Sequence, residues 1–129
     1  MINFDAVARA SDDFWYDHEF EVIQAQVERL SPSEWDEFER QCLVVPSESQ
    51  ERMAHVLGGI DTVASARLLL QLCERAERDT VLTAREAVRS MTLESVQRAA
   101  SDLWPSASGR TINEILDWVD EARRLRGDR

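Results

Sequence analysis

Apolar residues recur along the chain at alternating intervals of three and four, the spacing of one face of an α-helix. The clearest example is a stripe formed by Tyr16, Phe20, Ile23, Val27 and Leu30. No stretch alternates between apolar and polar residues over the length of a strand, and β-branched residues never cluster as they do in sheets. The pattern therefore predicts an all-α protein.

The helix starts are marked by capping residues. In a capping box, a Ser or Thr side chain and a Glu or Gln side chain three residues later each accept a backbone N–H. Pairs with this spacing stand at three candidate helix starts: Ser31 with Glu34, Ser47 with Gln50, and Thr111 with Glu114. Single capping side chains are expected at Asp61, at Asp79 or Thr80, and at Thr92. These signals divide the chain into seven or eight helices.

The helix ends are marked by Pro and Gly. Pro46 and Pro105 disfavour helical geometry in the residue before them, so helices are expected to end there. Gly58 and Gly59 are expected to end another helix through the left-handed conformation that glycine tolerates. The joints within residues 47–104 are short, and short joints force neighbouring helices to lie antiparallel.

The segment from Asp61 to Met91 looks like a HEAT-type helix pair, because a Leu68-Leu69-Leu70 run is followed by a second apolar helix rich in alanine. A plain helical bundle accounts for the same pattern. The predicted fold is a single all-α domain of seven to eight antiparallel helices, with a middle that is either HEAT-like or bundle-like.

Length and cysteine content fit one self-sufficient domain. A chain of 129 residues with 43% hydrophobic residues can bury a core without a metal or a disulfide. Cys42 and Cys73 belong to no CxxC pair and fall at apolar helical positions, which predicts two buried thiols. The chain opens without a basic and apolar leader and contains no apolar run that could span a bilayer, so we expect a cytoplasmic protein.

The sequence offers little for catalysis. His18 and His55 are the only histidines. The Asp17-His18-Glu19 run points its side chains in different directions around a helix, so they cannot converge on one metal ion. Glu51 and His55 share a helix face but have no third ligand. The glycines and serines fit neither a phosphate loop nor a nucleophile elbow. We therefore expect no catalytic residues, no metal and no cofactor, and a protein that is not an enzyme.

The net charge of −10 is carried by one end of the chain. Residues 1–51 contain 13 Asp and Glu against three Arg, whereas residues 52–129 contain 12 acidic and 12 basic side chains. Repulsion within so acidic a region costs stability, so its retention suggests a use. We expect an acidic helical end (residues 1–51) and a neutral, repeat-like part (residues 52–129) within one domain.

The acidic end carries aromatic side chains among its carboxylates. Carboxylates steer and orient a basic partner, while Trp and Tyr supply burial energy at the centre of an interface. Phe20 and Phe38 are expected in the core, and at least one of the adjacent Trp15 and Tyr16 is expected to be partly exposed. The residues predicted to contact a partner are Asp12, Asp13, Trp15, Tyr16, Asp17, Glu19, Glu21, Glu34, Trp35 and Glu37. A solvated acidic face over an ordinary core is the alternative interpretation.

In size, charge and HEAT-like middle, the chain is similar to bacterial immunity proteins of polymorphic-toxin and contact-dependent growth-inhibition systems. The resemblance implies a protein that binds a cognate toxin domain, often a basic nuclease, and blocks its active site. The acidic end would then occupy the groove in which the toxin holds phosphates. The resemblance rests on no diagnostic motif, so it assigns no role to any single residue.

Two other functions fit the same pattern. A helical scaffold or adaptor would hold a peptide or a partner helix on its middle helices, around Arg67, Arg85 and Arg89. A nucleic-acid mimic would use the acidic end against a DNA-binding protein. Direct binding of nucleic acid is not expected, because the chain has no basic stripe; the arginines of residues 123–129 are expected to complement a helix C-terminus. No membrane partner is expected.

Overall fold

The computed structural model describes residues 2–125, which are helical and contain no strand. The helices are α1 (Phe4–Arg9), α2 (Asp12–Phe14), α3 (Phe20–Glu28), α4 (Pro32–Cys42), α5 (Ser47–Gly58), α6 (Val63–Arg75), α7 (Arg78–Arg89), α8 (Leu93–Leu103) and α9 (Ile112–Leu125). A π-helical turn, η1 (Trp15–Glu19), joins α2 to α3 without a break, and a short 3₁₀ turn, η2 (Pro105–Ala107), precedes α9. The described residues thus form eight helical segments in one domain, which confirms the predicted fold class.

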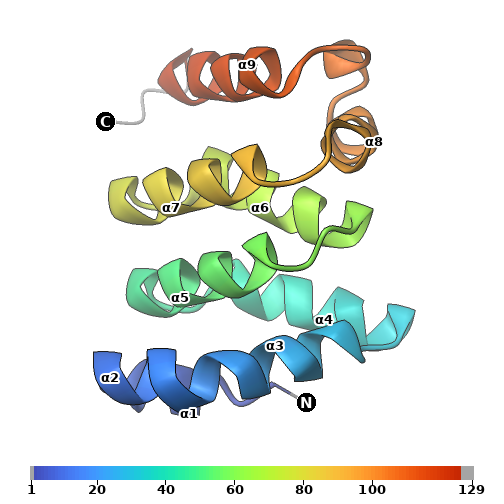
Figure 1. The fold of residues 1–129 in the computed structure, drawn as a ribbon. Helices are drawn as coiled ribbons and strands as arrows, with labels where there is room; N and C mark the ends of the chain where they lie inside the picture. The colour runs from blue at the N-terminus through green and yellow to red at the C-terminus, as the bar shows by residue number, and fades with distance from the viewer. Residues whose placement is uncertain (1, 126–129) are drawn as a thin grey trace.

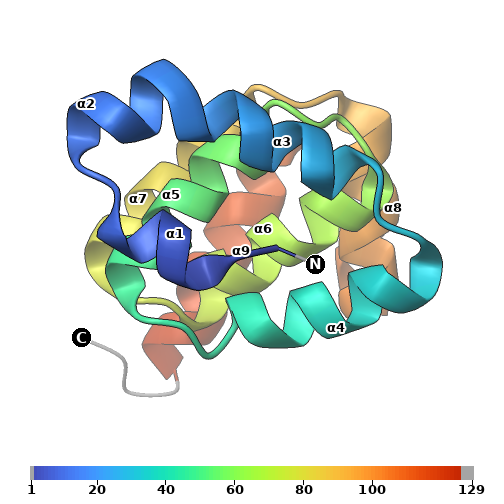
Figure 2. The same cartoon turned by 90° about the horizontal axis from the view of Figure 1, so that it is seen from below.

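The helices stack in layers from one end of the molecule to the other (Figure 1). The first layer holds α1, α3 and α4, the last holds α9, and between them α5 packs on α7 while α6 packs on α7 and α8. Seen from below, α1, α3 and α4 cover the next layer and close that end of the stack (Figure 2). This order fits both arrangements predicted for the middle, and the HEAT-like assignment stays a prediction. No helix within the described range is long and apolar enough to cross a membrane.

Helix α6 occupies the centre of the core. Its Leu68-Leu69-Leu70 run is fully buried because other helices pack on it from several sides. Cys42 and Cys73 are also buried, as predicted, and neither forms a disulfide. Burial raises the pKa of Cys42 far above its ordinary value and that of Cys73 to about 12, so both thiols stay protonated and unreactive at neutral pH.

Two of the three predicted capping boxes are present. The Ser31 hydroxyl accepts the N–H of Glu34 at 3.2 Å, and the Glu34 carboxylate accepts the N–H of Ser31 at 2.9 Å. Thr111 and Glu114 make the same pair of hydrogen bonds at 3.2 and 3.1 Å. The first box fixes the tight turn between α3 and α4, and the second starts α9.

The third box, at Ser47 and Gln50, was predicted wrongly. Gln50 is buried, and its amide donates to the carbonyl of Cys42 at 2.9 Å, so it satisfies the end of α4 instead of the start of α5. Asp79 and Thr80 do not cap α7 either, because both lie within that helix. The Thr80 hydroxyl donates to the Ser47 carbonyl at 3.0 Å and links α7 to α5. Polar residues with capping spacing thus serve contacts between layers.

The predicted cap at Asp61 is displaced by one residue. Thr62 caps α6, and its hydroxyl accepts the N–H of Ser65 at 3.1 Å. The Asp61 carboxylate instead accepts the N–H and the hydroxyl of Thr92, at 3.3 and 3.2 Å. Asp61 therefore joins the loop before α6 to the loop before α8. Thr92 caps α8, as predicted.

The capping boxes predict an acid-dependent part of the stability. Hydrogen bonds from backbone N–H groups lower the pKa of Glu34 and of Glu114 from the ordinary value of 4.5. A carboxyl whose pKa is lower in the folded state stabilises the protein above its unfolded pKa, and this contribution is lost as pH falls through the folded pKa. The Tm of a double variant, Glu34→Gln with Glu114→Gln, should therefore fall less between about pH 5 and pH 3 than the Tm of the natural chain. Circular dichroism melts measure this, and equal losses would contradict it.

Gly58 sets how closely α5 approaches α7. A Cβ at Gly58 would lie 2.9 Å from the Cβ of Ala87 and 3.4 Å from its Cα. The predicted left-handed end at Gly58 and Gly59 is wrong, because Gly109 alone among the described residues has a positive φ. Glycine is therefore needed at position 58 for space between two helices.

The change Gly58→Ala is expected to destabilise the protein by about 1 kcal/mol. Overpacking costs about 1–3 kcal/mol, while the better helix propensity of alanine returns about 0.5–1 kcal/mol. In an Ala87→Gly background the same change should cost nothing, because the opposing Cβ is gone. Urea denaturation of the four proteins tests this; equal costs in both backgrounds would show that the Ala87 contact is not the cause.

Candidate partner-binding surface

The helical rod from α2 to α3 contains a π turn that decides which aromatic side chain is buried. In η1 the N–H of Phe20 donates to the carbonyl of Trp15, five residues earlier. The inward row of this rod is therefore Trp15, Phe20, Ile23 and Val27, spaced five, three and four. The predicted stripe began at Tyr16 because it assumed 3.6 residues per turn throughout, and the wider turn moves Trp15 into its place.

The two adjacent aromatic residues face opposite environments. Trp15 is fully buried, so the prediction that it contacts a partner is wrong. Tyr16 is 55% exposed, as expected for at least one of the two, and its ring lies edge-on to His55 with centroids 6.1 Å apart. Phe38 is fully buried and Phe20 packs against the core, as predicted. Of the two adjacent aromatic residues, Tyr16 is thus the one that this rod offers to a partner.

Arg52 of α5 fixes the rod and α1 to the second layer. Its guanidinium donates to the carbonyls of Val7 and Ala10, both at 2.7 Å, and to the Asp12 carboxylate at 3.0 Å. The same group lies over the Trp15 ring, 5.3 Å from its centroid. The two carbonyls belong to the end of α1, where a positive charge is favourable. One side chain therefore holds together three segments of the acidic end.

Tyr16 and His55 border a polar pocket of about 390 Å³ between the rod and α5. Its other lining residues are Asp12, Glu48, Glu51 and Arg52. Because Arg52 pairs with Asp12, the carboxylates of Glu48 and Glu51 give the pocket its acidic character. The sequence did not reveal Glu48, Glu51 and His55 as neighbours of Tyr16. Their spacing of three and four marks one helix face, but only the folded stack brings that face beside η1.

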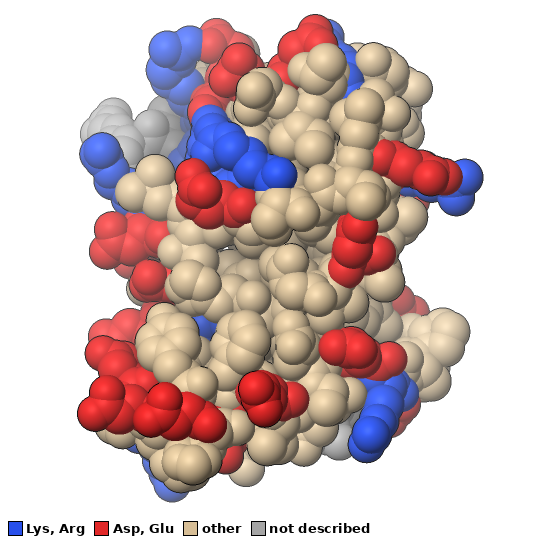
Figure 3. Space-filling model, in the orientation of Figure 1, with Lys and Arg blue, Asp and Glu red and all other residues tan. Residues whose placement is uncertain are grey.

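The acidic residues predicted to contact a partner fall into two groups. Three already have a partner within the chain: Asp12 pairs with Arg52, Glu34 accepts the N–H of Ser31, and Glu37 pairs with Arg40. Four make no side-chain hydrogen bond or ion pair within residues 2–125: Asp13, Asp17, Glu19 and Glu21. Figure 3 shows acidic side chains gathered at the lower left, over α2 and the turns that follow it. The unengaged carboxylates therefore belong to the same rod as Tyr16.

Two exposed apolar side chains of this rod were not predicted. Phe14 and Val22 are each about half exposed, and the Phe14 ring packs against His18 at a centroid distance of 5.2 Å. The sequence gives no sign of their exposure, because the register of the rod changes within η1. Together with Tyr16 they add apolar contact area between the carboxylates. We call the solvent-accessible side chains of this rod the acidic rod face: Asp13, Phe14, Tyr16, Asp17, Glu19, Glu21 and Val22. Phe14 and Glu19 line a pocket towards α1, whereas Tyr16 lies towards α5.

Trp35 lies apart from the acidic rod face. It belongs to α4, which runs on the other side of α1 from α2 and α3 (Figure 2). The Trp35 ring packs edge-on against Phe38, 5.1 Å between centroids, and its remaining surface lines a second pocket. The ten residues predicted to contact a partner therefore do not form a single patch. Asp12 and Tyr16 line one pocket, and Trp35 lines the other.

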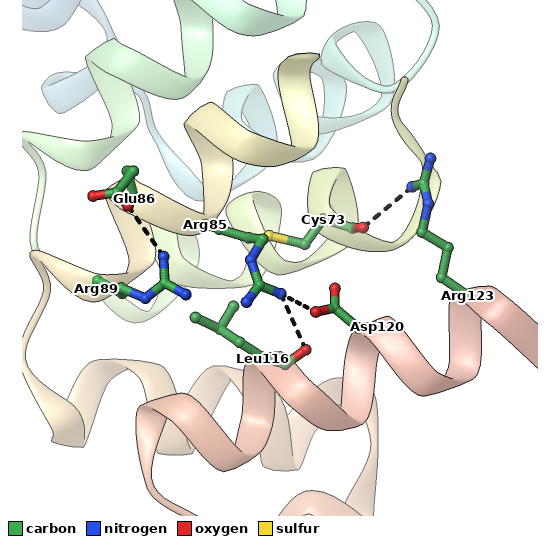
Figure 4. A network of polar contacts seen from close by, with 7 residues as sticks. All are labelled: Cys73, Arg85, Glu86, Arg89, Leu116, Asp120 and Arg123. Atoms are coloured by element: carbon green, nitrogen blue, oxygen red, sulfur yellow. Dashed lines mark hydrogen bonds and ion pairs between the residues drawn. The ribbon is translucent and has the colours of Figure 1, made fainter. Parts of the chain in front are cut away.

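The arginines predicted to serve an adaptor function have partners inside the chain. Arg85 of α7 pairs with Asp120 of α9 and donates to the Leu116 carbonyl at 3.4 Å (Figure 4). Arg67 and Arg89 also form ion pairs, with Glu39 and Glu86 respectively. Arg85 is mostly buried and bridges two helices, so it has a structural role.

Arg123 of α9 complements the C-terminus of another helix. Its guanidinium donates to the carbonyl of Cys73 at 3.3 Å (Figure 4). It also donates to the carbonyls of Glu74, at 3.2 Å, and of Ala76, so that all three acceptors lie at the end of α6. This confirms for Arg123 the expected pairing of the basic tail with a helix C-terminus. Arg126 and Arg129, the last two arginines of that prediction, lie outside the described residues.

Across residues 2–125, no three His, Cys, Asp or Glu side chains are grouped so that they could hold a metal ion. The chain matches no protein-family model, and no curated protein or solved structure is similar enough to match it. A functional proposal therefore rests on the geometry and charge of the acidic end.

Proposed function

We propose that this chain is an immunity-type protein that binds a basic toxin domain, such as a nuclease, and neutralises it by covering its active site. The observation that carries the proposal is the acidic rod face, where one helical rod carries four unengaged carboxylates together with the exposed ring of Tyr16. The concentration of the whole net charge in residues 1–51 supports it as well.

The proposed mechanism is occlusion without catalysis or a cofactor. A nuclease that holds phosphates presents Lys and Arg in its groove, and the carboxylates of Asp13, Asp17 and Glu21 take the place of those phosphates. These carboxylates steer the encounter with the toxin, while the ring of Tyr16 becomes buried in the interface and loses its contact with water. Neutralisation of a toxin inside the cell would require the protein in the cytoplasm.

The adaptor alternative has less support, because Arg67, Arg85 and Arg89 already pair within the chain. A nucleic-acid mimic would use the same acidic rod face. The two inhibitor functions differ only in the protein that is captured, a toxin domain in one case and a host DNA-binding protein in the other.

The proposal is tested with the C-terminal domain encoded by the gene next to this one. That domain should stop bacterial growth when expressed alone, and co-expression of this chain should restore growth. The double variant Asp17→Arg with Glu21→Arg should abolish the protection at an unchanged circular dichroism spectrum. A matched control, Asp102→Arg with Asp117→Arg, changes the charge equally at two exposed acids of α8 and α9 and should protect fully.

The association rate should also fall by about tenfold between low salt and 0.5 M NaCl, because salt screens steering beyond a Debye length of about 10 Å at 0.1 M. Surface plasmon resonance with the same toxin domain measures this rate. Full protection by the rod variant, or a domain that kills equally with and without this chain, would refute the proposal.

A further inference from the structure

A second pocket, of about 390 Å³, lies where the end of α3, the start of α4 and the start of α6 meet. Its apolar lining consists of Val27, Leu30, Pro32, Trp35, Ile60 and Ala64. We call this pocket the Trp35 groove. Its volume is at the low end for a small-ligand site and suits one large side chain of a partner.

The groove is held open by rigid contacts. The capping box at Ser31 fixes the turn between α3 and α4, so Leu30 and Trp35 stand on either side of a tight bend. Trp35 is braced edge-on by the buried ring of Phe38. Because both walls are positioned before any partner arrives, binding of a side chain costs little conformational entropy in the walls.

The charged residues that line the groove are both acidic. Glu28, at the end of α3, and Asp36, in α4, are exposed and make no side-chain hydrogen bond or ion pair with the rest of the described chain. Arg29 follows Glu28 in the chain but is not part of the lining. An apolar cleft with two unengaged carboxylates at its rim complements an apolar side chain that has cationic neighbours.

We propose that the Trp35 groove receives one large aliphatic or aromatic side chain of the basic partner, while Lys or Arg residues flanking it pair with Glu28 and Asp36. This inference rests on the proposed function and adds a second contact to the one at the acidic rod face. The apolar side chain supplies burial against Trp35, and the flanking cations fix its register along the groove. The same rim repels an acidic segment, and an uncharged apolar segment gains no ion pair from it.

The probe is the tripeptide acetyl-Arg-Leu-Arg-amide, titrated into the ¹⁵N-labelled full chain and followed by ¹H–¹⁵N correlation spectra. The indole N–H of Trp35 and the amides of Ile60 and Ala64 should shift in a saturable way. Acetyl-Arg-Gly-Arg-amide and acetyl-Glu-Leu-Glu-amide should bind at least about fivefold more weakly. Equal binding of the glycine peptide, or shifts confined to Tyr16 and His55, would overturn the inference.

Two variants test the apolar contact in the groove and the ion pairs at its rim separately. Ala64→Leu fills the groove without changing any charge, and Glu28→Lys with Asp36→Lys reverses the rim without touching the core. Each should weaken the Arg-Leu-Arg peptide at least about fivefold. The matched control, Asp102→Lys with Asp117→Lys, places the same charge change in the last turn of α8 and the middle of α9 and should leave binding unchanged.

The same variants, measured against the toxin domain, separate this inference from the proposed function. A toxin domain that binds Ala64→Leu and the rim variant as tightly as the natural chain would overturn the role of the groove and leave the proposed function standing. A groove that takes the peptide as described, in a chain that does not protect against the toxin domain, would reject the proposed function and keep the groove.

Discussion

Replacement of Trp15 by alanine is expected to lower the free energy of unfolding by about 3–5 kcal/mol, the usual cost of removing a buried aromatic side chain. Trp15 is fully buried, meets Phe20 edge-on at 6.1 Å between centroids, and lies under the guanidinium of Arg52. Alanine would lose all these contacts and leave a cavity between the rod and the second layer. Urea denaturation monitored by circular dichroism measures the change.

Two neighbouring variants serve as controls. Trp15→Phe keeps a ring in place and removes a buried indole Nε1 that finds no hydrogen-bond partner within residues 2–125, so it should cost less than half as much. Tyr16→Ala, at a position that is 55% exposed, should change stability by less than about 1 kcal/mol but weaken binding of the toxin domain. A stable Trp15→Ala protein with impaired binding would instead place Trp15 in the interface.

The second large effect is expected for Arg52→Met, which should destabilise the protein by about 2–4 kcal/mol. Arg52 is 17% exposed, and methionine retains its apolar stem but none of its donors. The carbonyls of Val7 and Ala10 then lose their charged hydrogen bonds at the end of α1. Hydrogen exchange should accelerate first in residues 4–10, because α1 is the element that this guanidinium anchors.

The variant Arg52→Lys separates the contribution of the charge of Arg52 to stability from the contribution of its planar shape. An ammonium group cannot span two carbonyls and a carboxylate as the planar guanidinium does, so lysine should restore less than half of the lost stability. Asp12→Asn removes only an ion pair to a carboxylate that is 88% exposed and should cost no more than about 0.5 kcal/mol. If Arg52→Met cost no more than Asp12→Asn, the contacts with α1 would have no energetic role.

Much of the fold was predictable because helices and their caps depend on residues that are close together in the sequence. The boxes at Ser31 and Thr111 were found from spacing alone, and the buried cysteines from their place in apolar stripes. Gln50 and Asp61 have the same local appearance, but each satisfies a group in another layer. A sequence pattern does not distinguish a cap from a contact between layers, since both use the same side-chain oxygens and amides.

The candidate surface was predictable in location but not in detail. Charge counting pointed to residues 1–51, and the structure does expose Tyr16 there. The burial of Trp15 was missed because the π turn changes the helical period for a single turn. Glu48 and His55 were missed because their proximity to Tyr16 depends on how α5 packs against the rod. Both failures concern geometry that no short stretch of sequence encodes.

The π turn has a consequence for how this protein is compared with others across evolution. A π turn amounts to one extra residue accommodated inside an α-helix, and such turns are frequent at functional sites. A descendant of the same ancestor without it would align to this chain only with a one-residue gap in residues 15–19, inside a helix where gaps are seldom accepted. Sequence similarity would then be underestimated at the segment that displays Tyr16.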